Sequence, residues 1–206
     1  MKLFDYIINK KDYLIDIDKI REMKEIILLP RYFKDGASSR IRTYNHLDLF
    51  KKLGKVKVFQ FHHKKYIKLL YEQNRRDLFL LFFSVLKRIK TIFVIKNNSF
   101  IYVEKEFFPQ SIFILEFLAL KLLKFKGCKI FIDFDDATFV SASINFLSKI
   151  FISPKYNYLC KKADEVTVGS TELFKWAQKY NKNITKISSS PQISSIIARK
   201  DNSNKK

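Results

Sequence analysis

The sequence predicts a three-layer α/β domain with a mostly parallel β-sheet, and two observations lead to this fold class. Short apolar runs, rich in β-branched and aromatic residues, alternate along the chain with longer segments of helical periodicity. This alternation is typical of parallel strands joined by right-handed crossover helices. Hydrophobic residues make up 47% of the 206 residues, which is enough for a sizeable core and argues against global disorder.

The expected elements follow one another in a simple order. Strands are expected over residues 26–29, 56–59, 100–103, 130–132, 166–168 and 184–187. Helices are expected over about 41–53, 63–95, 109–126, a segment that ends at 163, and 170–180. The α/β domain then spans residues 26–190, between an N-terminal extension at 1–25 and an altered linker with a polar tail at 191–206.

Three carboxylates follow the strand expected at 130–132, namely Asp133, Asp135 and Asp136. Strand alternation places Asp133 and Asp135 on one side, and Asp136 on the other side or in the loop. Ligands of open α/β sheets bind beyond the carboxyl ends of the strands. Crowded carboxylates repel, which raises some of their pKa values and suits general base catalysis or cation binding. The alternative is a solvated loop whose aspartates cap the next helix.

The loop after the first strand carries a second group of candidate residues: Gly36, Ser38, Ser39 and Arg40, with Arg42 nearby. A glycine lets the backbone approach a ligand closely, and a helix N-terminus offers free N–H groups to an anion. The arginines can bind a phosphate or a carboxylate. Ordinary helix capping by one of the two serines is the alternative.

Glu104 and Glu106 follow the strand expected at 100–103. They occupy the same relative place as the aspartates, so acids are expected at two strand ends on one sheet edge. Salt bridges to neighbouring lysines are the alternative role. No metal site is expected, because His62 and His63 are adjacent and point apart in an extended chain.

The chain is strongly basic, with 40 Lys+Arg against 20 Asp+Glu and a net charge of +20. This charge predicts a polyanionic neighbour. Residues 63–90 intersperse basic with aromatic side chains, as in surfaces that bind anionic lipid head groups. No nucleic-acid-binding motif is present. Without a signal-peptide core or a long apolar segment, we expect a cytoplasmic protein that can lie on the inner face of the plasma membrane.

Taken together, these segments resemble the N-terminal domain of family 4 glycosyltransferases of the GT-B type, bacterial members that build surface polysaccharide or lipopolysaccharide. The resemblance lies in residues 29–44, 103–109, 132–137, 163–170 and 180–183. It implies a Rossmann-like domain, one half of a GT-B fold, that binds a glycan or lipid-linked acceptor. The sugar donor would be a nucleotide-sugar, without a separate cofactor.

The resemblance also assigns roles to the candidate residues. It places Gly36 near the donor phosphates, with Arg40 nearby, and the three aspartates at the cleft where an acceptor hydroxyl would sit. The family continues into a second domain that holds the donor, whereas this sequence ends at Lys206. We therefore expect a hexosyltransferase half that needs a separate donor domain. The alternative is a non-catalytic membrane-surface or scaffold domain that has kept the fold.

Overall fold

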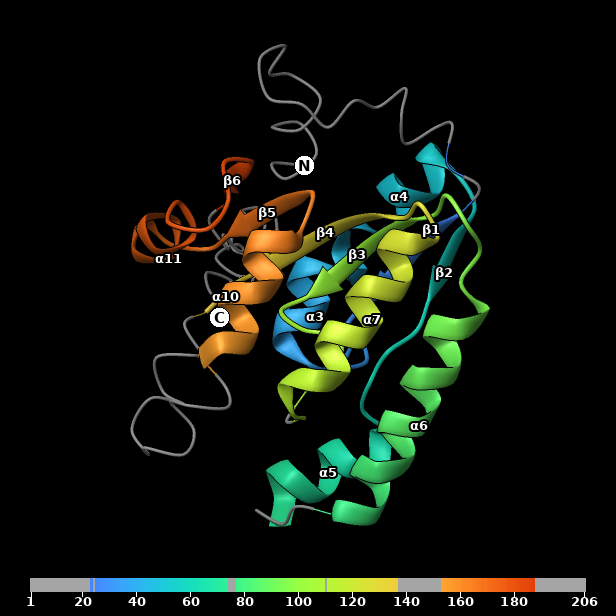
Figure 1. Cartoon of the computed structure of the whole chain (residues 1–206). Coiled ribbons are helices and arrows are strands. Elements are labelled where there is room, and N and C mark those ends of the chain that lie inside the picture. The colour runs from blue at the N-terminus through green and yellow to red at the C-terminus, as the bar shows by residue number, and fades with distance from the viewer. Residues whose placement is uncertain (1–22, 24, 74–76, 110, 137–152, 188–206) are drawn as a thin grey trace, which may run out of the picture.

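The computed structural model describes residues 23, 25–73, 77–109, 111–136 and 153–187, which fold around one six-stranded sheet (Figure 1). Every strand pair is parallel, and the strand order is β2-β1-β3-β4-β5-β6. The strands are β1 (Ile26–Leu29), β2 (Val56–Val58), β3 (Phe100–Glu104), β4 (Lys129–Phe134), β5 (Glu165–Val168) and β6 (Ile184–Lys186). The predicted three-layer α/β class is confirmed.

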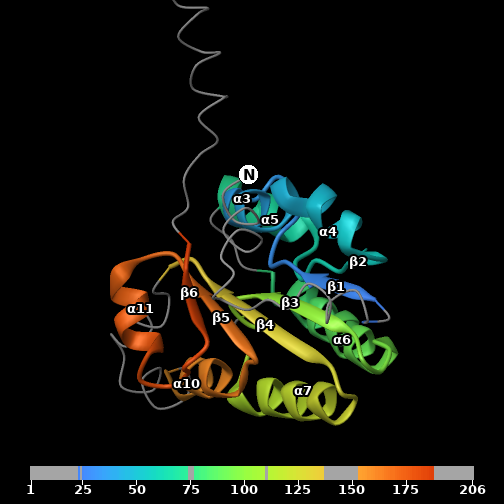
Figure 2. The ribbon, with the colours of Figure 1, turned by 90° about the horizontal axis from the view of Figure 1, so that it is seen from above.

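Helices cover both faces of the sheet (Figure 2). On one face lie the short helices α3 (Ala37–Arg42) and α4 (Leu47–Leu53), joined by a 3-10 turn at Tyr44–His46. On the other lie α6 (Leu78–Val94), α7 (Phe113–Phe125) and α10 (Ser153–Lys162). Helix α5 (Lys64–Gln73) precedes α6, and α11 (Thr171–Ala177) connects β5 to β6.

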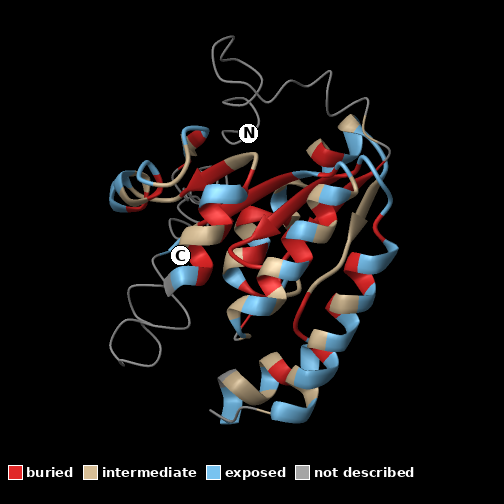
Figure 3. Cartoon of the chain, viewed as in Figure 1, coloured by how far each residue is buried: buried red, intermediate tan, exposed pale blue. Residues whose placement is uncertain are grey.

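The apolar core consists of two layers because successive strand side chains point to opposite faces. In β1, Ile27 and Leu29 join the cluster under α6, α7 and α10, whereas Ile26 and Leu28 join the cluster under α4. The buried strand residues are coloured red in Figure 3. Both faces of the central strands are therefore apolar, as in other parallel sheets.

Two of the predicted helices are interrupted. The helix expected over 41–53 breaks at Thr43, where the Arg42 carbonyl accepts a hydrogen bond from the Tyr102 hydroxyl (3.3 Å) and the His46 N–H bonds to Thr43 instead. The helix expected over 63–95 divides into α5 and α6, and the Asp77 carboxylate caps α6 by accepting from the Leu80 N–H (2.9 Å). A side-chain cap thus starts a second helix inside a continuous basic pattern.

Other boundaries moved by a few residues. Helix α7 begins at Phe113 rather than near residue 109, and α11 ends at Ala177 rather than near 180. Gly127 ends α7 with a φ of 71°, as its position predicted. The extension at 1–25, apart from residues 23 and 25, and the tail at 191–206 lie outside the described residues. Among the helices of the described ranges, none has the length and apolarity of a transmembrane span.

Candidate functional site

The candidate site lies where the strand order reverses. From β1 the chain moves to β2 on one side, and then returns to β3 on the other side of β1. The loops that leave β1 and β3 therefore diverge, and such a switch point is where open α/β sheets bind ligands. Strand β4 lies next to β3, so its carboxyl end belongs to the same rim.

One serine hydroxyl joins two of the predicted acids at this point. Ser38 Oγ, at the start of α3, lies 2.7 Å from Glu104 Oε1 and 2.6 Å from Asp135 Oδ2. Ser39 donates to the other Glu104 oxygen (2.6 Å). The first loop and the acids of β3 and β4 thus meet at one edge of the sheet, as the sequence predicted. The serines lie inside α3 and bind carboxylates, whereas Gly36 occupies the N-cap position without a side-chain cap.

The Ser38 hydroxyl is shared between the two acids. It has one hydrogen and can donate to only one of the two carboxyl groups at a time. Burial raises the pKa of Glu104, and the nearby Asp135 charge adds to this, although hydrogen bonds from Ser38 and Ser39 oppose it. Burial therefore disfavours the charged form of Glu104, and the two serine hydroxyls stabilise it.

Lys105 keeps Asp135 ionised. Burial would raise the pKa of Asp135, but the Lys105 ammonium at 2.8 Å and the Ser38 hydroxyl outweigh it and lower that pKa. The same ammonium lies 2.7 Å from Asp136, whose side chain is 57% exposed. Asp135 is 14% exposed and Lys105 is 5% exposed, so Asp136 is the member of this carboxylate–ammonium–carboxylate row that faces solvent.

Asp133 lies deeper and binds side chains of the domain itself. It is fully buried, accepts from the Thr167 hydroxyl (2.5 Å) and forms an ion pair with Arg42 (3.5 Å). Burial raises its pKa, and Arg42 and Thr167 oppose that shift. Arg42, noted in the sequence as able to bind a carboxylate, thus binds one inside the chain. Strand β4 packs so closely here that a Cβ on Gly169 would lie 2.6 Å from the Asp135 carbonyl oxygen.

Glu106 does not join the aspartates. Lys105 has a φ of 64°, which turns the chain between the two glutamates. Glu106 instead contacts the Lys155 ammonium and accepts from the Tyr156 hydroxyl (3.2 Å), both from α10. Glu106 is therefore in a buried ion pair on the other face of the sheet, which matches the salt-bridge alternative for this residue.

Gly36 and Arg40 occupy different surroundings in the first loop. A Cβ on Gly36 would lie 2.5 Å from the Tyr32 Cβ, and the Tyr32 ring stacks on His62 (centroids 5.3 Å apart). Gly36 therefore serves close packing within the loop. Arg40 is exposed, and no hydrogen bond or ion pair joins its side chain to another of the described residues.

Sequence reasoning missed Lys105 and Thr167 as parts of the site. Lys105 was visible only as the middle residue of a Glu-Lys-Glu triplet, a pattern that is also common on exposed surfaces. Thr167 faces Asp133 because these two residues are paired in the β4–β5 register. Correct strand neighbours and register would have predicted that contact.

The arrangement suits hydroxyl binding better than proton abstraction. A carboxylate whose pKa is lowered is a weak base, so Asp135 in this state is not tuned for general base catalysis. Carboxylate oxygens can accept hydrogen bonds from several ligand hydroxyls, and the Lys105 ammonium, with two of its three donors directed at Asp135 and Asp136, has one left to donate. No group of three or more His, Cys, Asp or Glu side chains with metal-binding geometry occurs in the described ranges.

Comparisons with known proteins add no family to this picture. No protein-family model matches the chain, and no curated protein matches it.

Proposed function

We propose that this domain is the acceptor-binding half of a GT-B glycosyltransferase, which transfers a sugar from a nucleotide-sugar to a glycan or lipid-linked acceptor. The observation that carries the proposal is the Asp135–Lys105–Asp136 row at the switch point of an all-parallel sheet. Sugar hydroxyls are both donors and acceptors, and this row offers partners for both. The order of the similar sequence segments supports the same assignment.

The roles of the three aspartates differ in this proposal. Asp136, 57% exposed, and Asp135, 14% exposed, bind acceptor hydroxyls, because Asp133 is only 1% exposed. Asp133 is a positioning residue that holds Arg42 and Thr167 below them. The donor phosphates would be met by Arg40 at the mouth of the first loop, with the rest of the donor held by a second domain.

The test is genetic and does not require the donor domain to be identified. Deleting the gene should shorten or remove a surface glycan of the source organism, detected by gel electrophoresis and mass spectrometry. Complementation with the wild-type gene, or with Asp48→Asn as a matched control, should restore the glycan. Asp48 is 91% exposed, and its side chain pairs with Lys51 rather than with a residue of the site. Asp135→Asn should fail to restore the glycan while the protein accumulates normally.

Two results would overturn the proposal. One is a deletion strain with unchanged glycans under all growth conditions tested. The other is full restoration by Asp135→Asn, which would show that this carboxylate has no part in the activity.

A further inference from the structure

The outward face of α6 is apolar, the reverse of an ordinary surface helix. Its exposed residues include Leu78 (74%), Phe79 (70%), Phe82 (57%), Phe83 (49%) and Leu86 (44%). These positions recur at helical spacing and form one continuous stripe, and the Phe79 and Phe83 rings are in contact (centroids 4.6 Å apart). We call these five residues the α6 stripe. Contiguous exposed apolar patches of this kind mark interaction surfaces.

The inward face of the same helix is partly polar. It buries Ser84, Arg88, Thr91 and Ile92, and the half-buried Leu81, Val85 and Ile89 of the same helix pack against the apolar core. Arg88 points inward because it donates to the Pro30 carbonyl (3.4 Å) and lies near Glu104 and Glu116. The Arg88 charge is thus used inside the domain, whereas the Phe79, Phe82 and Phe83 rings face outward.

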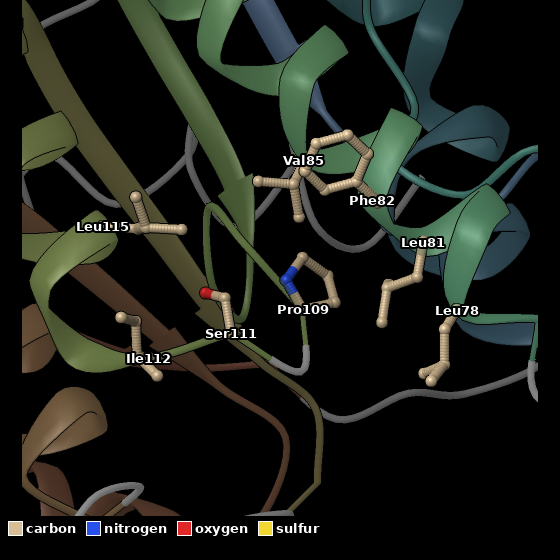
Figure 4. Close-up of a pocket in the computed structure, with 8 residues that line it drawn as sticks. All are labelled: Leu78, Leu81, Phe82, Val85, Pro109, Ser111, Ile112 and Leu115. Carbon is tan, nitrogen blue, oxygen red and sulfur yellow. The ribbon is translucent and has the colours of Figure 1, made fainter.

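The α6 stripe lies at the same end of the domain as the candidate site. Helix α6 carries the chain from the carboxyl end of β2 back to the amino end of β3, so its first turns lie at the carboxyl edge of the sheet (Figure 1). A groove of about 310 Å³ separates these turns from the start of α7 (Figure 4). Its lining is almost entirely apolar: Leu78, Leu81, Phe82, Val85, Pro109, Ser111, Ile112 and Leu115.

Lysines flank the stripe. Lys87 and Lys90 are exposed on α6, and exposed lysines on the preceding helix α5 are Lys64, Lys65 and Lys68. Acidic residues are fewer in the described part of these two helices: Glu72 lies on α5 and Asp77 at the start of α6. A surface with aromatic residues beside lysines is complementary to a bilayer with anionic head groups, where rings enter the interface and lysines meet phosphates.

We propose that the α6 stripe and its lysines dock this domain on an anionic phospholipid bilayer, with the carboxyl edge of the sheet facing the membrane. The charge of the flanking helices selects this occupant over an uncharged apolar partner. Membrane docking by α6 and hydroxyl binding at Asp135 use different residues, so failure of one test leaves the other intact.

Vesicle flotation tests the proposal with the full chain. Wild-type protein should float with vesicles of phosphatidylcholine containing about 30% phosphatidylglycerol, and bind pure phosphatidylcholine more weakly. Phe82→Ser with Phe83→Ser should lower the partition constant about tenfold or more, because two rings leave the interface. Phe125→Ser is the matched control, since Phe125 is 90% exposed at the far end of α7, and it should bind as wild type.

Charge reversal separates the contribution of the lysines. Lys87→Glu with Lys90→Glu should weaken binding to the anionic vesicles. Raising the salt concentration from about 0.1 M to about 0.5 M should then lower the binding of this variant by a smaller factor than that of the wild type. Lys161→Glu with Lys162→Glu makes the same net-charge change on the exposed end of α10, and should weaken binding less. Circular dichroism should show that all four variants keep the wild-type helix content, because the replaced side chains are exposed.

Three results would overturn the proposal. The first is no binding to the anionic vesicles. The second is an equal loss in the Phe125→Ser variant, which would mean general stickiness. The third is a dimer, detected by light scattering, that the Phe82 and Phe83 substitutions dissociate. This result would show that the α6 stripe binds a second copy of the chain.

Discussion

Replacing Arg42 with methionine should destabilise the fold strongly, because it leaves a carboxylate buried without its cation. The Arg42 and Asp133 side chains are 4% and 1% exposed, with the charged groups 3.5 Å apart. Breaking a buried ion pair from one side costs about 3–5 kcal/mol. The variant also loses the hydrogen bond from Arg42 to the Ile187 carbonyl (3.1 Å). Since domains are stable by about 5–15 kcal/mol, the loss is a large share of the total.

Urea unfolding followed by tryptophan fluorescence measures this loss. Trp176 is the single tryptophan, and its ring packs edge-on against Phe134 at the end of β4 (centroids 5.2 Å apart). Arg40→Met is the matched control, because it makes the same chemical change in the same helix at an exposed position. It should change the free energy of unfolding by less than about 0.5 kcal/mol.

A second substitution tests whether the uncompensated charge is the cause. Adding Asp133→Asn to Arg42→Met removes the buried charge and should recover at least about half of the lost stability. In Arg42→Met alone, stability should fall as pH rises from about 4, because folded Asp133 then has a raised pKa and binds more protons than the unfolded chain. The reasoning is refuted if Arg42→Met costs no more than Arg40→Met, or if Asp133→Asn restores nothing.

Three further substitutions test single features of the site. Glu104→Gln keeps an oxygen that can accept from Ser39 and adds an amide that can donate to Ser38, so urea unfolding near pH 7 should show a loss below about 1 kcal/mol. It should also flatten the decline in stability with pH above about 4.3, because burial raises the pKa of Glu104 in the folded state; a steeper decline would contradict that direction. Gly169→Ala should lower the free energy of unfolding by about 1–3 kcal/mol in thermal unfolding, since its Cβ would lie 2.6 Å from the Asp135 carbonyl oxygen. In the control Gly54→Ala the nearest atom to the new Cβ is 3.5 Å away, so stability should be nearly unchanged. Lys105→Ala should raise the lowered pKa of Asp135, measured by a carbon-detected NMR titration. An unchanged pKa would show that Lys105 is not what lowers it.

Strand alternation made part of the site predictable from the sequence. Asp133 and Asp135 were expected on one side of β4, and both contact α3, Asp133 through Arg42 and Asp135 through Ser38. The parallel topology, which follows from alternating strands and helices, then placed these acids at the same edge as Glu104. Period-two alternation holds while the chain stays extended, so predictions of this kind work up to the last residue of a strand.

The rest depended on local geometry that leaves no pattern in the sequence. Glu106 would follow Glu104 onto the same side in an extended chain, but the left-handed conformation of Lys105 turns it away. A single non-glycine residue at positive φ has no reliable sequence signal. Likewise Arg40 and Arg42 both lie in α3, and only the rotation of this helix about its axis decides that Arg42 points inward.

The location of charge separates the two roles proposed for this domain. The acids at the sheet edge are paired with cations, with Asp135 and Asp136 on Lys105 and Glu106 on Lys155. The rim therefore has little spare positive charge, although the chain as a whole carries +20. That excess includes the exposed lysines of α5 and α6, so the polyanionic partner that the composition predicts is better matched by the outer surface of these helices than by the site. A row of hydroxyl-binding groups with two carboxylates and one ammonium, beside a basic, aromatic surface, fits a ligand held at a membrane more closely than one held by its own negative charge.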